Sequence, residues 1–162
     1  NSRARLRMTT LYALGQRSRA LVAGTGNKVE DFGVGFYTKY GDGGVDLSPI
    51  ADLTKTEVFA LAAHLAVIDA IQQAAPTDGL WGDDRTDEDQ LGATYPELEW
   101  AMAWEADHTE TGTEALNQKE EDLSWRQKEV LTIYRKHHRA NKHKMLPIPV
   151  CHIPLDVRRR GA

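Results

Sequence analysis

Residues 22–46 of the chain read VAGTGNKVEDFGVGFYTKYGDGGVD. Glycines, lysines and several carboxylates follow directly after a short apolar run. Glycines let a backbone approach phosphate groups, a lysine neutralises them, and carboxylates hold a metal ion or a ribose. The stretch therefore indicates a nucleotide site. Two simpler interpretations stay open, because Gly41–Gly44 could form only a turn and Asn27 with Glu30 only a helix cap.

The segments around this stretch predict a βα unit. Residues 20–23 are an apolar run typical of a buried strand, a glycine turn follows, and a helix should begin near Asn27. Open α/β sheets bind ligands at the carboxyl ends of their strands, where Thr25 would lie. We therefore expect an α/β fold with a doubly wound, Rossmann-like parallel sheet.

Helices are predicted along the rest of the chain. Thr54 with Glu57 and Ser124 with Gln127 form capping boxes that begin helices running to about residues 65 and 140. A further helix begins at Thr94, with Pro96 in its first turn. A first helix covers residues 1–16. The expected core-facing residues are Leu6, Met8, Leu11, Tyr12 and Leu14 in the first helix, Val58, Leu61, Ala62 and Leu65 in the second, Leu98, Ala101, Met102 and Trp104 in the third, and Val130, Leu131 and Tyr134 in the fourth.

The connecting segments differ in composition. Residues 68–73 should add a short helical turn, and residues 105–122 a polar surface connection. Residues 76–90 carry six acidic residues and no helical pattern, which predicts a long mobile loop. Residues 145–162 contain three prolines and should form an extended tail.

Composition limits the function classes. The chain has 162 residues and a formal net charge of −4, so it fits one domain or part of one, and nucleic acid is not an expected partner. Its single cysteine, Cys151, cannot form an internal disulfide, which suits a reducing compartment. No apolar run approaches the ~20 residues that a membrane-spanning helix needs. We therefore expect a cytoplasmic protein with no membrane partner.

Several short segments stand out along the chain, and they are NSRARLRM at 1–8, GTGNKVE at 24–30, TKYGDG at 38–43, DLTK at 52–55, PTDGLW at 76–81 and TDE at 86–88, with NKHK at 141–144. In this order they resemble segments of the NAD synthetases, the ligases that amidate deamido-NAD, with NKHK the weaker match. The resemblance covers the half of the enzyme that follows its ATP-phosphate loop. It implies a fold of the adenine nucleotide alpha-hydrolase type.

The resemblance implies a two-step reaction. The nicotinate carboxylate of deamido-NAD attacks the α-phosphorus of ATP and releases pyrophosphate, and ammonia then displaces AMP. A carboxylate is a poor acceptor for ammonia, so it must first be activated. Because two anions must meet, magnesium and cationic side chains have to screen them. The protein contributes mainly positioning and charge stabilisation.

The resemblance also implies site residues. Three residues match ATP contacts of the family: Thr25, Lys55 and Thr77. Six match contacts to deamido-NAD: Arg5, Lys39, Asp42, Asp46, His143 and Lys144. Glu30 matches a Mg²⁺ ligand. From the residues alone, Glu30 could instead be the capping partner of Asn27. Lys55 would lie in a first helical turn, where the helix dipole disfavours a cation. Such a local conflict is typical of a functional position.

The sequence departs from the family in one respect. It contains no Ser-Gly-Gly-x-Asp-Ser loop for the pyrophosphate end of ATP. We therefore expect residues 1–162 to form the C-terminal portion of a single synthetase domain, with a sheet incomplete at its N-terminal side and with residues 76–90 as a lid. Such a portion alone should be inactive. The resemblance implies a homodimer, and it leaves open whether ammonia is free or derived from glutamine.

Two alternatives remain from the sequence. One is another adenylating enzyme of the same superfamily, such as a GMP or asparagine synthetase, although TKYGDG at 38–43 looks specific to the NAD branch. The other is a non-catalytic fragment or oligomerisation module, since the unpaired edge of an incomplete sheet favours a partner chain. Deamido-NAD binding separates the ligase from the structural fragment.

Overall fold

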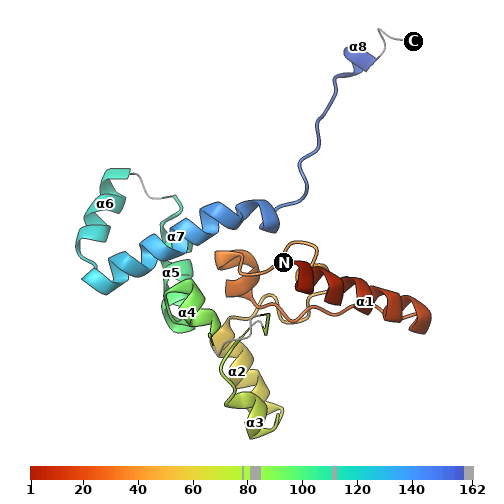
Figure 1. Ribbon diagram of the computed structural model, residues 1–162. Helices are drawn as coiled ribbons and strands as arrows, with labels where there is room; N and C mark the ends of the chain where they lie inside the picture. Colours follow the sequence, from red (N-terminus) through yellow and green to blue (C-terminus); the bar gives the residue numbers. More distant parts are fainter. Residues whose placement is uncertain (78, 81–84, 111–112, 159–162) are drawn as a thin grey trace.

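The computed structural model describes residues 1–77, 79–80, 85–110 and 113–158. Figure 1 shows the helices in chain order, and within the described ranges they are α1 (Ser2–Ser18), the π-helix η1 (Val29–Val34), α2 (Lys55–His64), α3 (Asp69–Gln72), α4 (Asp87–Leu91), α5 (Tyr95–His108), α6 (Thr113–Glu121), α7 (Trp125–Met145) and α8 (Leu155–Arg158). None of these helices is long and apolar enough to cross a lipid bilayer.

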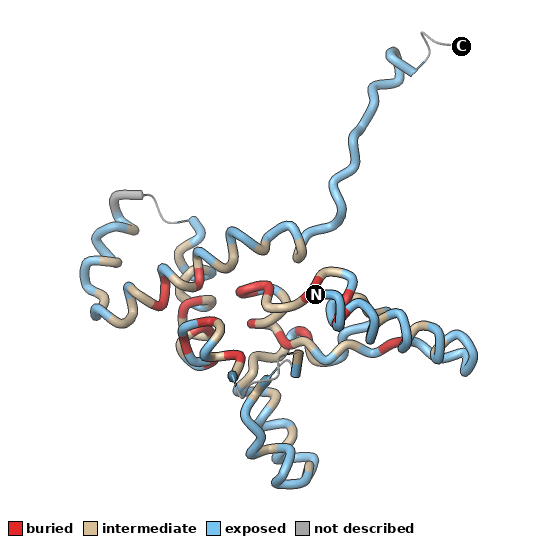
Figure 2. Tube along the Cα trace, in the orientation of Figure 1, coloured by how far each residue is buried: buried red, intermediate tan, exposed pale blue. Residues whose placement is uncertain are grey.

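The core lies where α5 and α7 pack on each other and on η1. Figure 2 places most of the buried chain at this junction, whereas α1, α2 and the C-terminal tail are largely exposed. The predicted inner faces of α5 and α7 are confirmed, with Met102 and Trp104 only partly buried against the core. The buried members are Leu98, Ala101, Val130, Leu131 and Tyr134.

The predicted parallel sheet is reduced, within the described ranges, to one parallel bridge between Ala23 and Leu47. Gly24 N donates to Leu47 O at 2.7 Å, and Asp46 N donates to Val22 O at 2.9 Å. A strand over residues 20–23 is therefore wrong in extent, because the pairing ends after these few bonds. The parallel direction is the one that a βα unit requires.

The helices predicted to begin at Thr54, Thr94 and Ser124 all begin there, each with a capping box, although at Thr94 only the helix start was predicted. Thr54, Thr94 and Ser124 each accept a hydrogen bond from the backbone N–H three residues on, and the third residue returns one. The turn at residues 68–73 is also present, as α3. These predictions succeed because a capping box involves only four consecutive residues.

Other predictions need correction. Leu61 and Leu65 of α2 are exposed, since α2 and α3 project from the core (Figure 1). Leu6, Leu11 and Leu14 of α1 are exposed as well. The predicted polar connection at 105–122 includes the end of α5 and all of α6, and an ion pair of 2.6 Å between Glu120 and Arg135 holds α6 against α7.

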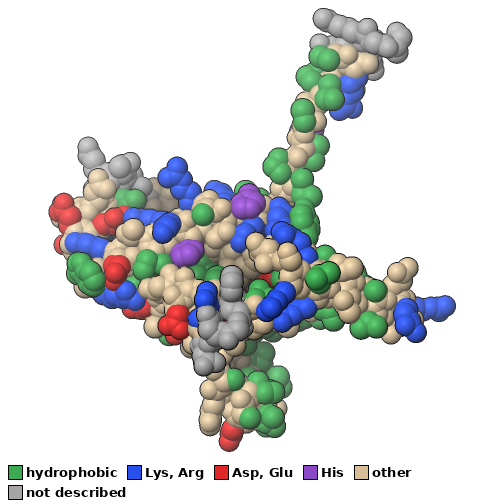
Figure 3. All heavy atoms as spheres, viewed as in Figure 1, with side chains coloured by type: hydrophobic (Ala, Val, Ile, Leu, Met, Phe, Trp, Pro, Cys, Tyr) green, Lys and Arg blue, Asp and Glu red, His purple; other side chains and the backbone are tan. Residues whose placement is uncertain are grey.

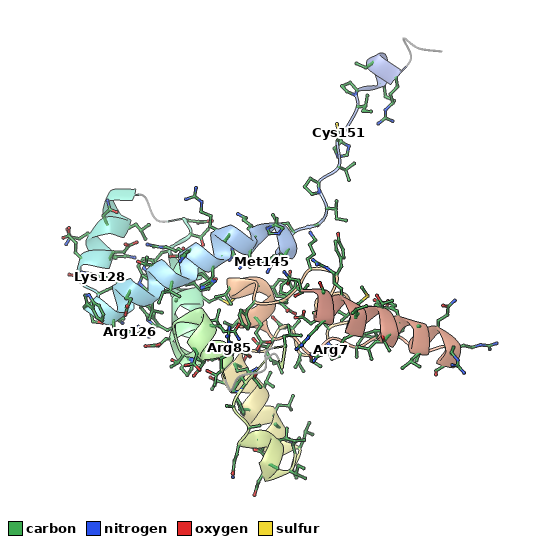
Figure 4. All side chains as sticks on the ribbon, in the orientation of Figure 1. Arg7, Arg85, Arg126, Lys128, Met145 and Cys151 are labelled. Carbon is green, nitrogen blue, oxygen red and sulfur yellow. The ribbon has the colours of Figure 1, made fainter. Side chains whose placement is uncertain are left out.

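The segments expected to be irregular are partly helical. The loop expected at 76–90 ends in α4, which begins at its own capping box, Thr86 with Asp89. Residues 78 and 81–84 of that loop lie outside the described ranges. The tail is extended from residue 146 but ends in α8, and Cys151 is exposed in it, away from the core (Figure 4).

Candidate functional site

A cavity of about 240 Å³ lies beside η1, between the glycine turn at 24–26 and the end of α7. Met145, which lines it, ends α7 close to η1 (Figure 4). Polar and charged side chains from two separate parts of the sequence, residues 25–48 and the end of α7, meet here. They are Thr25, Glu30, Asp31, Tyr37, Asp42, Ser48 and Lys144.

Gly26 allows the close approach on which one wall of the cavity depends. A Cβ atom built on Gly26 would lie 2.3 Å from Asp31 Oδ1, so any side chain there would force the Asp31 carboxylate to move. The glycine therefore lets the Asp31 carboxylate lie against the turn. This arrangement agrees with the role of glycine in turns that approach ligands closely.

Glu30 makes the capping contact that its spacing with Asn27 predicts. Asn27 Oδ1 accepts hydrogen bonds from Val29 N at 3.0 Å and Glu30 N at 3.1 Å. Asn27 N donates to Glu30 Oε2 at 3.3 Å. The interpretation of Glu30 as the capping partner of Asn27 is thus correct, and this contact uses only Oε2 of the carboxylate.

The other oxygen of Glu30 has two donors. Lys55 Nζ lies 2.8 Å from Glu30 Oε1, and the Tyr95 hydroxyl donates to the same oxygen at 2.7 Å. The side chains of Lys55 and Glu30 are only 19% and 14% exposed. Lys55 Nζ also lies 4.8 Å from the centre of the Tyr95 ring. Lys55 and Glu30, which the resemblance matches to an ATP contact and a magnesium ligand, are therefore direct neighbours.

Tyr95 was missed by the sequence reasoning, which used it only to mark the start of a helix. It is 3% exposed, and its hydroxyl also lies 3.3 Å from Asp87 Oδ2. Burial raises the pKa of Tyr95 far above its usual range, and the Glu30 carboxylate raises it further. The hydroxyl therefore stays protonated and acts as a donor.

Asp31 was also missed. Burial raises the pKa of its carboxyl to about 6, and the negative charges of Glu30 and Asp42 add to the effect. The cavity thus concentrates negative charge on one side, which favours cations there. No pattern in the sequence distinguishes Asp31 from a surface aspartate following Glu30.

The last turns of α7 bind the end of η1. His138 Nδ1 lies 2.7 Å from Gly33 O, and Asn141 Nδ2 donates to Val34 O at 2.9 Å. Lys144 Nζ donates to the carbonyls of Gly35 and Tyr37 at 2.8 and 2.7 Å. These bonds explain why α7 continues past the predicted end near residue 140. They satisfy carbonyls that the end of a helix leaves without partners.

The remaining predicted residues do not line the cavity, and Arg5, Lys39 and His143 contact one another. Lys39 Nζ donates to His143 O at 2.7 Å, and an Arg5 nitrogen donates to Lys39 O at 3.3 Å. Asp46 accepts from Val22 N at 2.8 Å and from the Tyr12 hydroxyl at 3.2 Å.

Thr77 lies apart from this group. Its hydroxyl contacts Arg85 O at 3.4 Å and Gly79 N at 3.3 Å, within the predicted lid. Basic side chains are spread over the face that Figure 3 shows, along α7 and the N-terminal part of α1. The predicted residues therefore form a cavity group (Thr25, Glu30, Asp42 and Lys144, with Lys55 bound to Glu30) and a peripheral group (Arg5, Lys39, Asp46, Thr77 and His143).

A family model described as NAD synthase matches residues 1–147. The chain belongs to the NAD synthase family. Curated relatives named NH(3)-dependent NAD(+) synthetase include one from Carboxydothermus hydrogenoformans, 50% identical over 99 residues, and one from Mesoplasma florum, 47% identical over 105. The matches cover 61% and 65% of this chain but only 40% and 42% of those proteins. The chain thus spans about two fifths of the length of these relatives.

Two solved structures agree with this chain in fold. An NMN synthetase from Francisella tularensis superposes with a TM-score of 0.73 at 33% identity, over 94% of this chain and 55% of that one. An NH3-dependent NAD synthetase from Campylobacter jejuni gives a TM-score of 0.61 at 24% identity, over 92% and 53%. The fold family is therefore the expected one, while the extent of the sheet is not.

Proposed function

We propose that the protein carrying this chain makes NAD by ATP-dependent amidation of deamido-NAD, and that the cavity beside η1 is part of its active site. The observation that carries the proposal is the pairing of Lys55 with Glu30 at the cavity. A cation and a carboxylate held side by side suit a site that must bind phosphates and a metal ion together. Membership of the NAD synthase family supplies the reaction class.

Glu30 is the residue that we propose as a ligand of Mg²⁺. The described ranges contain no group of three or more His, Cys, Asp or Glu side chains placed to hold a metal ion. Magnesium does not require one, because it is commonly bound by one or two carboxylates together with substrate phosphates. The hard oxygen donor of Glu30 fits this pattern. When bound, the ion would neutralise negative charge on the phosphates.

The reaction would proceed in two balanced steps. A nicotinate carboxylate oxygen forms a bond to the α-phosphorus of ATP while the bond to pyrophosphate breaks, which gives an acyl adenylate. Ammonia then adds to the acyl carbon, AMP leaves with its electron pair, and one proton is released. Lys55 and Thr25 would contact ATP. Asp42 and Lys144 would contact the pyridine-bearing substrate, together with the peripheral residues Arg5, Lys39, Asp46 and His143.

Lys55 must exchange partners during this cycle. It is bound to Glu30 in the structure, and a phosphate group would compete for the same ammonium. Thr77 would join the ATP contacts when residues 76–90 close as a lid. Closure would protect the adenylate from water.

A second candidate substrate is nicotinate mononucleotide. The structural relative from Francisella tularensis is an NMN synthetase, and it superposes over 94% of this chain. Both acids carry the same reacting nicotinate carboxylate and differ in the adenylate half. We place deamido-NAD first because curated relatives at 47–50% identity are NAD synthetases.

The larger arrangement is also a proposal. The 162 residues contain no Ser-Gly-Gly-x-Asp-Ser loop, so we expect another part of the protein to bind the pyrophosphate end of ATP. We expect residues 1–162 alone to be inactive, and the intact protein to be a homodimer. Size-exclusion chromatography with light scattering tests the dimer.

The direct test is an assay of the intact protein with ATP, Mg²⁺ and ammonium, using each acid in turn. We expect NAD and AMP to form in equal amounts from deamido-NAD. A kcat/KM higher for nicotinate mononucleotide would establish the second candidate. Failure to amidate either acid would refute both. Replacing ammonium by glutamine in the same assay identifies the nitrogen source.

A further inference from the structure

We propose that Tyr95 is a positioning residue, whose hydroxyl holds the Glu30 carboxylate in place when Lys55 leaves it for ATP. This inference rests on the proposed function, because it concerns the same site. It assigns a task to a residue that was not part of the predicted site. The argument starts from the two donors that share one oxygen of Glu30.

The two donors differ in freedom. Lys55 is a flexible side chain on the first turn of α2, a helix that projects from the core. Tyr95 begins α5 and is a member of the core cluster, at 3% exposure. An ammonium on a four-carbon stem can reorient toward a phosphate, whereas a packed phenol ring cannot. Tyr95 is therefore the donor that stays.

The position of Tyr95 is fixed from both of its ends. Its backbone N–H donates to Glu88 Oε1 at 2.8 Å, and its hydroxyl lies between Glu30 and Asp87. Glu88 and Asp87 both belong to α4, the helix in which the predicted lid ends. The 2.7 Å distance to Glu30 and the 3.3 Å distance to Asp87 indicate that the single hydroxyl proton is directed mainly at Glu30.

Loss of the Lys55 contact would leave Glu30 Oε1 without its cation at the moment when the metal ion must bind. The 3.3 Å bond from Asn27 N to Oε2 would then be the remaining restraint on the carboxylate besides Tyr95, and any freedom to change rotamer would cost binding energy in ordering. Tyr95 prevents this reorientation while leaving oxygen lone pairs available to a metal ion. The chain thus couples α4 to the proposed metal ligand through one side chain.

The test compares Tyr95→Phe with Tyr134→Phe in the intact protein. Both changes remove one hydroxyl from a buried ring of the same core cluster. Tyr95→Phe also keeps the ring against Lys55. The first measurement is the affinity for Mn²⁺, a paramagnetic probe for the Mg²⁺ site. Electron paramagnetic resonance determines this affinity in the presence of ATP. The second is the KM for Mg·ATP and for the acid substrate.

We expect Tyr95→Phe to weaken Mn²⁺ binding and to raise the KM for Mg·ATP, each by about tenfold, the effect typical of losing a hydrogen bond to a charged group. The KM for the acid should change by less than about twofold, and Tyr134→Phe should match the wild type. Equal Mn²⁺ affinities in the two variants would overturn the proposal. Mn²⁺ binding does not depend on turnover, so this test remains valid if neither acid is amidated.

A double-mutant cycle with Glu30→Gln distinguishes an effect of Tyr95→Phe on Glu30 from a general defect in folding. If the hydroxyl acts through Glu30, Tyr95→Phe should raise the KM for Mg·ATP no further in the Glu30→Gln background. An undiminished effect of Tyr95→Phe in that background would contradict the positioning role, because the effect would then arise elsewhere.

Discussion

Lys55 Nζ lies 2.8 Å from Glu30 Oε1, and this ion pair brings together two residues that the sequence assigns to different ligands. Their side chains are mostly buried, so the pair is screened less than a surface pair. Each residue stabilises the charge of the other. In the proposed active site, a nucleotide phosphate would replace Glu30 as the partner of Lys55, and a metal ion would replace Lys55 as the partner of Glu30.

The first prediction concerns Lys55→Met. This change removes the ammonium but keeps much of the side-chain volume. We expect the KM for ATP to rise by about tenfold or more, because a charge-assisted contact to phosphate is lost. Steady-state kinetics of the intact protein measure it. Lys28→Met is the matched control, since Lys28 forms an exposed ion pair with Asp52. Equal KM values for the two variants would show that Lys55 does not contact ATP.

The second prediction concerns Gly35, whose φ of 64° lies in the left-handed region. A Cβ atom there would lie 2.4 Å from Asn141 Cβ, at the contact between η1 and α7. Gly35→Ala should therefore lower the free energy of unfolding by about 2–4 kcal/mol, the range for strain combined with overpacking.

Gly92→Ala is the control for this experiment. Gly92 also has a positive φ, 83°, but its Cβ would meet only Ile133 Cδ1, at 3.7 Å. We expect a loss of about 1 kcal/mol from the backbone conformation alone. Urea unfolding measures both variants. Equal losses would contradict the tight packing of η1 against α7.

The third prediction uses the pH dependence of stability. Two hydrogen bonds join Arg126 to Glu97, at 2.7 and 2.8 Å, and they lower the pKa of Glu97 to about 2 from an ordinary 4.5. The Glu97 carboxylate therefore binds a proton more tightly in the unfolded chain than in the folded one. The contribution to stability is therefore present above pH 4.5 and is lost as the pH falls toward 2.

Arg126→Gln should accordingly destabilise the protein near neutral pH and match the wild type near pH 2. Thermal unfolding across this pH range measures the difference. Glu129→Gln removes the other partner of Arg126 and keeps Glu97, so it should preserve the pH dependence. A stability difference that did not change with pH would mean that the Glu97 pair does not form in solution.

The sequence predicted the local features of the fold well. Thr54, Thr94 and Ser124 begin their helices where expected, because each cap is formed within four residues. The extent of the sheet and the exposure of Leu61 and Leu65 could not be predicted in this way. Both depend on what packs over a segment, and periodicity identifies an apolar face without identifying its cover.

Only the part of the candidate site that lies within one stretch of sequence was predicted. Thr25, Glu30 and Asp42 lie in one glycine-rich stretch, and the cavity brings them together. Tyr95 and Asp31 were missed. Tyr95 meets Glu30 across 65 positions of sequence, and no motif marks that contact. Asp31 differs from other acidic residues only in its burial and in the charges around it.

The most direct test of the proposed function follows an oxygen atom. The intact protein is supplied with deamido-NAD labelled with ¹⁸O in the nicotinate carboxylate, together with ATP, Mg²⁺ and ammonium, and AMP is analysed by mass spectrometry. If the carboxylate attacks the α-phosphorus, each AMP formed with NAD carries one ¹⁸O atom. Unlabelled AMP, or ADP in its place, would contradict amidation through an acyl adenylate at this site.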